Sequence, residues 1–469
     1  MNATEALCKM SRLYFNYFQS ERQLWHNPHP ECGLNVMPED LSRFPTVPYN
    51  AVAFPMDTTE QSAYTKESEG TSPNKKLKLH AEFKGPPNGE LLIRTVDPMK
   101  KDASSLKTCI KAADLNIEKD GDLNHSVRLL GDIETVKVTF NEEGYSISEW
   151  EGGIIELTIN DADIWSRGIY ASWQFWQWQF SVDEGKTWEI VGGLLNRGIS
   201  MHRIFAIKSI ASWPWTGYDE IVKHVNDDYY VSQPPYLGAL EWACKWAKGE
   251  TTVQGIVSKI VSKLNDCHRF DYPITGAMNY TSPYNNYFDC GRFIDRLNGK
   301  YGRGPNVNCV DCAHMVVALA NALGCGLQTG KIQNPTTSDG KIIPFKLNPV
   351  TLIGWNELAP ADHEFAYHQI AFKPSEDDAS MDNVFDACIK FDRETYLKVV
   401  NMKPEGEPID LLTPEMEKGH PVDIPIGTDV FTYGYMAILA KSLEEASQKD
   451  LSMNKGDELT FSISALKFY

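Results

Sequence analysis

The stretch that decides the fold is NVNCVDCAHMVVALANALGCG, residues 306–326, where two cysteines open an unusually apolar run. Asn306 or Asn308 can cap a helix that starts near Cys309, and Gly324 can end it. Nearly every position between them is apolar or small, so the sequence predicts a helix that is buried on most sides. A cysteine in the first turn of such a helix gains thiolate character from the unpaired amides and the helix dipole. Cys309 occupies that place.

The second cysteine, Cys312, lies one turn further along the predicted helix. It lines up with Val316 and Leu319, so we interpret it as a small core residue. A zinc site would need a second ligand pair at matching spacing, and Cys267 with His268 is the one nearby suggestion. A thioredoxin-like redox pair would need its own strand–helix frame. The pattern favours one nucleophile, and we expect neither a metal nor a cofactor.

Two predicted strands downstream supply the groups that a thiolate needs. His368 lies on HEFAYHQIAF, and Asp386 lies on NVFDACIKFD. In nucleophilic catalysis an imidazole accepts the thiol proton and a carboxylate fixes the tautomer of that imidazole. The order Cys, His, Asp therefore predicts a catalytic set of Cys309, His368 and Asp386. The alternatives are His363 as the base, and Asp382 or Asp392 as the carboxylate.

Residues 81–210 are predicted to form a β domain. Short runs rich in β-branched and aromatic residues are separated by Gly, Asp and Asn turns, which indicates an antiparallel β-sandwich. Within WQFWQWQFSV, apolar and polar positions alternate as in a half-buried strand. The apolar positions are Trp176, Trp178, Phe180 and Val182, and the polar ones are Gln177, Gln179 and Ser181. We expect the tryptophans to lie in the core, with carbohydrate binding by this face as the secondary interpretation.

The same strand continues into SVDEGKTW, Ser181 to Trp188, which resembles the Asp-box hairpin of sialidase-type propellers. In this hairpin Asp183 can accept bonds from the turn amides, Gly185 can take a positive φ, and Trp188 can pack back on the turn. A propeller would need the motif repeated at blade spacing, and the sequence holds one copy. The motif is therefore interpreted as a folding element.

The remaining segments differ in composition and in sequence pattern. Residues 1–80 are interpreted as an N-terminal helix, an irregular Pro-rich segment and a polar linker from Asp57 to His80. From residue 211 the pattern changes to helices. YLGALEWACKWAKG and TVQGIVSKIVSKLND both carry apolar residues at helical spacing. An aromatic, Gly- and Asn-rich loop is expected from Pro273 to Asn308.

Composition narrows the class of partner. The 469 residues are 42% hydrophobic and 23% charged, with a formal net charge of -18, which would repel nucleic acid and an anionic membrane surface. The sequence contains no apolar run of the roughly 18 residues that a membrane span needs, and we find no secretory signal. Ten scattered cysteines suit reduced thiols. We expect a cytoplasmic protein, or one that is exported without a classical signal peptide.

The helix CVDCAHMVVALANALGCGLQTGKI resembles the nucleophile helix of the transglutaminase-like cysteine enzyme superfamily. The residues that match the family pattern are Cys309, Asp311, Ala313, Leu323, Gly324, His368 and Asp386. The resemblance covers roughly Tyr236 to Phe391. A second cysteine stands where the family commonly has an aromatic residue, and the strand after His368 lacks the frequent Trp. Neither departure removes a catalytic group.

The resemblance implies a papain-like α+β catalytic domain in residues 211–469 and acyl-transfer chemistry on a protein or peptide. Cys309 would attack an amide carbonyl, His368 would take and return the proton, and Asp386 would orient His368. The backbone N–H of Cys309 would hold the oxyanion together with a donor from the preceding loop. The candidates for that donor are Asn308 and Asn306.

The acceptor of the acyl group is left open by the sequence. Water at a backbone amide gives a peptidase, water at a glutamine side chain gives a deamidase, and a lysine amine gives a crosslinking transglutaminase. Animal crosslinking enzymes carry β-barrels after the core, and the chain beyond Asp392 is short for such barrels, so hydrolysis of a peptide or isopeptide-type bond is favoured. The alternative class is a non-enzymatic binding or assembly module, in which the aromatic-rich β domain recognises the partner.

Overall fold

The computed structural model describes most of the residues that the sequence marks as functional. The described residues are 7–14, 34–35, 49–55, 78–101, 104, 129–148, 153–159, 167–193, 198–209, 211–212, 215, 235–273, 279–282, 287–333, 339–341, 345–346, 351–355, 364–373, 383–390, 422–425, 460–464 and 467–468. The chain divides into two compact units. The first comprises Met1–Ile210 and Gly217–Leu237, and the second comprises Ala211–Thr216 and Gly238–Tyr469.

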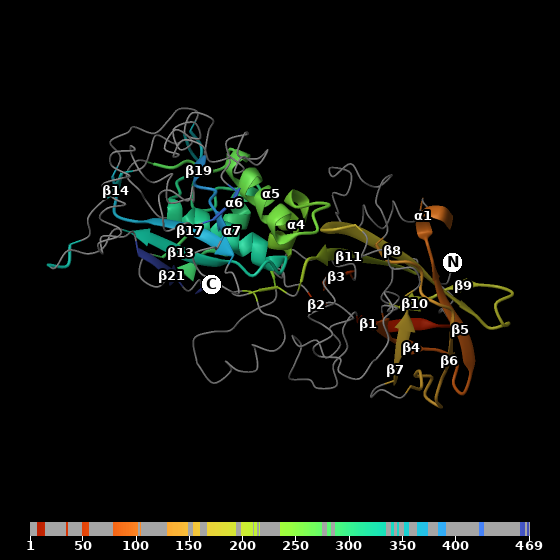
Figure 1. Ribbon diagram of the computed structural model, residues 1–469. Coiled ribbons are helices and arrows are strands. Elements are labelled where there is room, and N and C mark those ends of the chain that lie inside the picture. Colours follow the sequence, from red (N-terminus) through yellow and green to blue (C-terminus); the bar gives the residue numbers. More distant parts are fainter. Residues whose placement is uncertain are drawn as a thin grey trace, which may run out of the picture. The chain divides into compact units, whose positions relative to one another are not determined.

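The first unit is built from two β-sheets (Figure 1). The described strands of the smaller sheet follow the order β10 (Gly192–Gly193), β1 (Lys9–Tyr14), β4 (Lys78–Lys84), β7 (Ile154–Thr158). The larger sheet follows the order β2 (Leu34–Asn35), β3 (Tyr49–Pro55), β11 (Ile199–Ile207), β8 (Tyr170–Ser181), β5 (Glu90–Val96), β6 (Val136–Thr139), and β9 (Glu189–Ile190) pairs with β8. A short helix, α1 (Pro98–Lys101), follows β5.

Side chains from both sheets form one hydrophobic core. Met10 and Phe83 come from the smaller sheet, and Trp176, Trp178 and Phe180 come from β8 of the larger one. Trp176 and Trp178 are fully buried, and full burial of one large apolar side chain stabilises a fold by about 1.5–3 kcal/mol. These two rings therefore belong to the core, as expected, and neither is open to a carbohydrate.

Strand β8 is buried on both faces, so the prediction of a half-buried strand is wrong. Gln177 and Gln179 are buried although they alternate with the tryptophans. Gln179 finds a partner in Arg94, whose Nε and Nη2 donate to its side-chain oxygen at 3.1 and 3.0 Å. Arg94 lies in turn over the ring of Trp188, 3.7 Å from its centroid. Val182 follows the strand and is exposed.

Two further expectations for this unit are corrected. The segment Lys9–Tyr14 is strand β1 and not part of a helix, because Met10 pairs with Phe83 of β4 and enters the core. The sheets are mixed and not purely antiparallel, since β3 pairs with β11 in parallel and β1 pairs with β10 in parallel. The predicted linker up to His80 lies outside the described residues until β4 begins at Lys78.

The hairpin after β8 has the local contacts that its sequence predicts. The Asp183 carboxylate accepts the Thr187 backbone N–H at 2.8 Å, the Thr187 hydroxyl at 2.7 Å and the Ser181 hydroxyl at 2.7 Å. These hydrogen bonds, that of the Thr187 amide above all, lower the pKa of Asp183 to about 2. Gly185 has a φ of 85°, and the indole N–H of Trp188 donates to its carbonyl at 3.0 Å.

The second unit combines four described helices with an antiparallel sheet. The helices are α4 (Leu237–Trp246), α5 (Val253–Asp266), α6 (Cys290–Leu297) and α7 (Cys309–Ala322). The sheet order is β20 (Val422–Pro425), β18 (Asn383–Phe385), β17 (His368–Lys373), β13 (Gln328–Gln333), β21 (Thr460–Ser464). Two-stranded pairs join β12 (Tyr287–Phe288) to β22 (Lys467–Phe468), β14 (Phe345–Lys346) to β16 (Glu364–Phe365), and β15 (Thr351–Leu352) to β19 (Ile389–Lys390).

Taken over the described residues, the protein is mostly β-sheet with few helices. None of the described helices is long and apolar enough to cross a membrane. Helices α4, α5 and α7 confirm the predicted helices. The loop expected from Pro273 to Asn308 is wrong in part, because it contains β12 and α6, and HEFAYHQIAF is two strands, β16 and β17, and not one.

Helix α7 is the centre of the second unit and lies along β17 and β13 (Figure 1). All of its residues are buried, as the sequence predicts. The indole N–H of Trp215 donates to the Ala318 carbonyl at 2.7 Å. At the end of the helix the Asn321 side chain bonds both the N–H and the carbonyl of Leu327, and Gly324 takes a φ of 81°. Gly324 therefore ends the helix as expected.

His202 makes the stability of the first unit depend on pH. It is buried on β11, its Nε2 lies 2.7 Å from the Ser200 hydroxyl, and burial lowers its pKa to about 3. Below pH 6.5 the unfolded state takes up a proton that the folded state excludes, so stability falls as the pH falls, by at most about 1.4 kcal/mol per pH unit. We expect His202→Gln to flatten this dependence in denaturant unfolding at pH 7.5 and 5.

The matched control is His314→Gln in the second unit, whose histidine is equally buried and also has a pKa of about 3. That variant should flatten the acid dependence of the second unit and leave the first unchanged. Identical pH slopes for the wild type and His202→Gln would show that His202 is protonated in the folded state.

Candidate active site

The candidate site begins at the first residue of α7. Asn308 is the N-cap, and its side-chain oxygen accepts the backbone N–H groups of Val310 and Asp311 at 3.0 and 3.1 Å. Cys309 follows as the first helical residue and is 4% exposed. The capping oxygen takes up the amides of Val310 and Asp311 and not that of Cys309. The thiol therefore stands at the positive end of a capped and buried helix.

His368 and Asp386 come to this helix end from adjacent antiparallel strands. His368 is the first residue of β17, and Asp386 directly follows β18. The imidazole Nε2 lies 2.7 Å from Asp386 Oδ2, and Asp386 Oδ1 accepts the backbone N–H of Cys388 at 2.7 Å. Both side chains are buried. Each carboxylate oxygen thus has a partner, and the ring orientation of His368 is fixed.

The charge state of His368 is set by its two neighbours. Burial alone would lower its pKa, but the charge and hydrogen bond of Asp386, together with a hydrogen bond and charge from Cys309, raise that pKa to about 10. Since Nε2 faces Asp386, Nδ1 is the nitrogen left for the thiol. The structure thus brings together all three residues of the predicted set. The charged imidazolium form of His368 is favoured because His368 lies between Asp386 and Cys309, which can both carry negative charge.

The structure describes some of the other residues that the sequence singled out. His363, Asp382 and Asp392 are outside the described residues. The backbone carbonyl of Asn306 accepts the side-chain N–H of Asn279 at 2.9 Å, and the side-chain oxygen of Asn308 caps the helix, so the Asn308 side chain has a structural role beside the predicted oxyanion role. Cys312 is fully buried, as expected. In the described part of the chain no group of three metal-binding side chains occurs.

Asp311 ties the helix to the segment 279–282. Its carboxylate is fully buried and accepts the backbone N–H groups of Asn279 at 3.0 Å and Tyr280 at 3.2 Å. Burial raises the pKa of Asp311 to about 6, although these bonds and those from Thr281 lower it in part. The segment that precedes α6 is therefore fastened to the first turn of α7.

A second buried histidine, His314, continues this connection through the unit. Its Nε2 lies 3.1 Å from the side-chain amide nitrogen of Gln369, and its Nδ1 lies 2.9 Å from the Thr281 hydroxyl. Because an amide N–H₂ can only donate, Nε2 accepts and Nδ1 carries the proton. The Thr281 hydroxyl in turn bonds Asp311. Gln369, His314, Thr281 and Asp311 thus form one directional chain, in which His314 is neutral.

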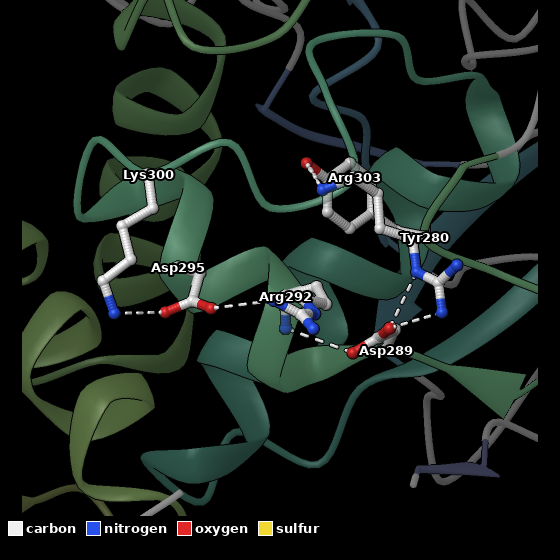
Figure 2. Close-up of polar contacts among 6 residues, drawn as sticks. All are labelled: Tyr280, Asp289, Arg292, Asp295, Lys300 and Arg303. Atoms are coloured by element: carbon white, nitrogen blue, oxygen red, sulfur yellow. Dashed lines mark hydrogen bonds and ion pairs between the residues drawn. The ribbon is translucent and has the colours of Figure 1, made fainter. Parts of the chain in front are cut away.

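A cluster of oppositely charged residues around α6 holds the loop that leads into Cys309 (Figure 2). Asp289 caps α6 by accepting the Arg292 backbone N–H at 3.1 Å, and its other oxygen receives Nε and Nη2 of Arg303, both at 2.7 Å. The Tyr280 hydroxyl accepts the Arg303 backbone N–H at 3.2 Å and donates to the Gly304 carbonyl at 2.6 Å. Arg303 therefore joins the segments on both sides of α6.

Sequence reasoning missed α6 and the clusters around Asp289 and His314. The signal for α6 was present, because its buried residues have the spacing of one helical face behind an N-capping Asp. Those buried residues are Cys290, Phe293, Ile294 and Leu297. The pairing of His314 with Gln369 had no such signal, since it depends on how β17 packs against α7.

The chain has a remote likeness to known proteins. No family model matches the sequence, and no curated protein matches it. Among solved structures it is similar to the red sea bream transglutaminase, with a TM-score of 0.31 and 11% sequence identity. The match covers 74% of this chain and 54% of the other, so the chain spans about half the length of that protein. A likeness this remote assigns neither family nor activity.

The Asp289 cluster predicts a graded loss of stability. Asp289→Asn keeps an oxygen for the cap and loses the charge facing Arg303, so we expect a loss of about 1 kcal/mol in the free energy of unfolding. Asp289→Ala removes the cap as well and should cost about 2 kcal/mol. Denaturant unfolding measures both.

Asp295 provides the control for this series (Figure 2). It pairs with Lys300 at 2.8 Å and with Arg292 at 3.7 Å, and the side chains of both partners are largely exposed. The Arg303 side chain is about as exposed as that of Lys300, but it brings two nitrogens to Asp289, whereas each partner of Asp295 makes a single contact, so Asp295→Asn should change stability by less than about 0.5 kcal/mol. Equal losses for Asp289→Asn and Asp295→Asn would contradict the role given to Arg303.

Proposed function

We propose that this chain is a cysteine enzyme that cleaves amide bonds by acyl transfer, with Cys309 as the nucleophile, His368 as the general acid–base and Asp386 as the residue that orients His368. The proposal includes a papain-like α+β core in the second unit and a β-sandwich in the first. The bond between His368 and Asp386, made beside a thiol at the capped end of α7, carries it.

The arrangement supports each step of such a reaction. His368 takes the Cys309 proton, and the sulfur attacks the carbonyl carbon while the carbonyl π pair moves to oxygen. When the C=O bond re-forms, the amine leaves with the proton from His368, and a thioester remains on Cys309. Water, activated by the now neutral His368, then attacks the thioester and releases the acid. Asp386 stays ionised throughout and stabilises the imidazolium.

We propose hydrolysis over transfer to a lysine amine, with a peptide or protein as substrate. Cys309 is 4% exposed, and water is the smallest acceptor that can reach a thioester in so covered a position. Tyr367 directly precedes His368, the first residue of β17, and is half-buried, and the Lys331 ammonium lies 4.0 Å from the centroid of its ring. Tyr367 is therefore proposed as part of the substrate entrance.

The nucleophile can be identified by competition among the cysteines. We expect iodoacetamide at pH 7 to alkylate Cys309 at least about ten times faster than Cys267, because His368 can hold the Cys309 proton while the sulfur reacts. Cys267 is the more exposed of the two, but burial raises its pKa to about 11. Peptide mapping by mass spectrometry after timed quenching measures both rates.

Two variants make that comparison specific. Cys309→Ala should abolish the fast phase of labelling, and Cys312→Ala, one turn further into the buried helix, should keep it. Labelling at one uniform rate across the cysteines would contradict the enzyme and favour a binding or assembly module on the same scaffold.

The dependence on Asp386 can be read from a pH profile. His368 holds its proton at neutral pH because Asp386, with a smaller contribution from Cys309, outweighs the effect of burial. Asp386→Asn should therefore leave His368 neutral, slow the alkylation of Cys309 at pH 7 by about tenfold or more, and move the rate profile to higher pH. Asp183→Asn, in the hairpin of the other unit, is the matched control and should leave the profile in place. An unchanged profile for Asp386→Asn would refute the role of Asp386.

A further inference from the structure

Tyr272 lies beside the nucleophile because its backbone is held by two other segments. Asp271 forms a parallel bridge with Asn306, in which its N–H bonds the Pro305 carbonyl at 2.9 Å and its carbonyl accepts the Val307 N–H at 3.0 Å. The chain then continues directly into Asn308 and Cys309. The pairing thus places Tyr272 alongside the residues that precede the thiol.

The other side of Tyr272 is fixed with equal firmness. Its N–H donates to the Ile353 carbonyl at 3.0 Å, and its carbonyl accepts the indole N–H of Trp355 at 2.8 Å. Gly354 stands between those two residues, and a Cβ there would lie 2.5 Å from the Phe270 carbonyl oxygen and 2.8 Å from Asp271 Cα. Only glycine allows this approach, so the position of Tyr272 is built into the fold.

The phenol of Tyr272 is buried beside the segment that leads into Cys309. The residue is 3% exposed, and the groups whose negative charge would raise its pKa most, after burial, are in order Cys309, Cys388, Cys312 and Asp386. After burial, these charges are the causes that raise the pKa of Tyr272, so the hydroxyl keeps its proton at any pH where the site works. A buried, protonated hydroxyl beside the nucleophile is a hydrogen-bond donor in a water-poor site.

From this placement we infer that Tyr272 is a catalytic residue, whose hydroxyl donates a hydrogen bond to the oxyanion that forms when Cys309 attacks a carbonyl. The inference rests on the proposed acyl transfer at Cys309. As the carbonyl π pair moves to oxygen, the phenol O–H donates to it without giving up its proton, and the backbone N–H of Cys309 is the second donor. When the leaving group departs, the pair returns to the C=O bond and the hydrogen bond weakens. Tyr272 thus joins Asn308 and Asn306 as a candidate donor.

The experiment separates the oxyanion from the thiolate. p-Nitrophenyl acetate, an activated ester, needs both the nucleophile and the oxyanion donor, whereas alkylation by iodoacetamide forms no oxyanion. We expect Tyr272→Phe, in the full chain, to lower kcat for the ester by about 10²–10³-fold, as loss of one such donor does. Its rate of Cys309 alkylation should stay within about twofold of the wild type. Cys309→Ala gives the background rate of ester hydrolysis.

Tyr280→Phe controls for the loss of a buried phenol. Tyr280 is also buried, but its hydroxyl bonds Arg303 and Gly304 of the neighbouring loop. This variant should lower the midpoint of thermal unfolding while the ratio of ester turnover to alkylation stays at the wild-type value. Tyr272→Phe should lower that ratio instead.

Each remaining outcome decides against one of the two proposals. Wild-type ester turnover by Tyr272→Phe would overturn the oxyanion role and leave Cys309 as the nucleophile. An equal loss of turnover and alkylation would make Tyr272 a positioning residue of the thiol and also overturn the inference. If wild-type Cys309 neither reacts with iodoacetamide in preference to Cys267 nor turns over the ester, the acyl-transfer proposal fails, and the role of Tyr272 fails with it.

Discussion

The complete burial of α7 is the constraint on which the second unit depends. A helix with no face in water cannot leave its first amides or its polar side chains to solvent, so protein groups must satisfy them. Asn308 takes up two of the amides, and Asp311 and His314 draw the segment 279–282 and strand β17 onto the helix. The same need that stabilises the helix end therefore assembles the walls around Cys309.

Contact with a carboxylate explains why two equally buried histidines on neighbouring elements have opposite charge states. His368 contacts Asp386 directly and its pKa is raised to about 10, whereas Thr281 stands between His314 and Asp311 and the pKa of His314 falls to about 3. A raised pKa stabilises the fold below pH 6.5, and that contribution is lost as the pH rises through 10. A lowered pKa acts in the opposite direction and destabilises the fold as the pH falls from 6.5. A carboxylate in direct contact with His368 thus gives this residue the charge state opposite to that of His314.

The parts of the fold that could be predicted from the sequence are those decided by neighbours along the chain. The cap at Asn308, the stop at Gly324 and the turn around Asp183 each depend on a few adjacent residues, and each forms as expected. The second buried face of β8 could not be predicted, because Gln179 is buried through Arg94 of another strand. The prediction of a helix in place of strand β1 is wrong for a related reason. Six residues fit either the helical or the strand period, and the pairing of Met10 with Phe83 decides for the strand. The predictions from local sequence pattern therefore failed where pairing between distant segments determines the structure.

The candidate site divides along the same line. Cys309, His368 and Asp386 can be chosen from the sequence because chemistry limits which residue types can serve as nucleophile, base and carboxylate, and their order does the rest. Tyr272 cannot be chosen in this way, because tyrosine is a common core residue. Its position follows from three segments that meet only in the fold: 270–272, 305–307 and 353–355. The close approach of these segments requires glycine at position 354, because a side chain there would clash with the backbone of residues 270 and 271. The close packing of Gly354 against residues 270 and 271 therefore fixes the position of Tyr272 beside the candidate nucleophile.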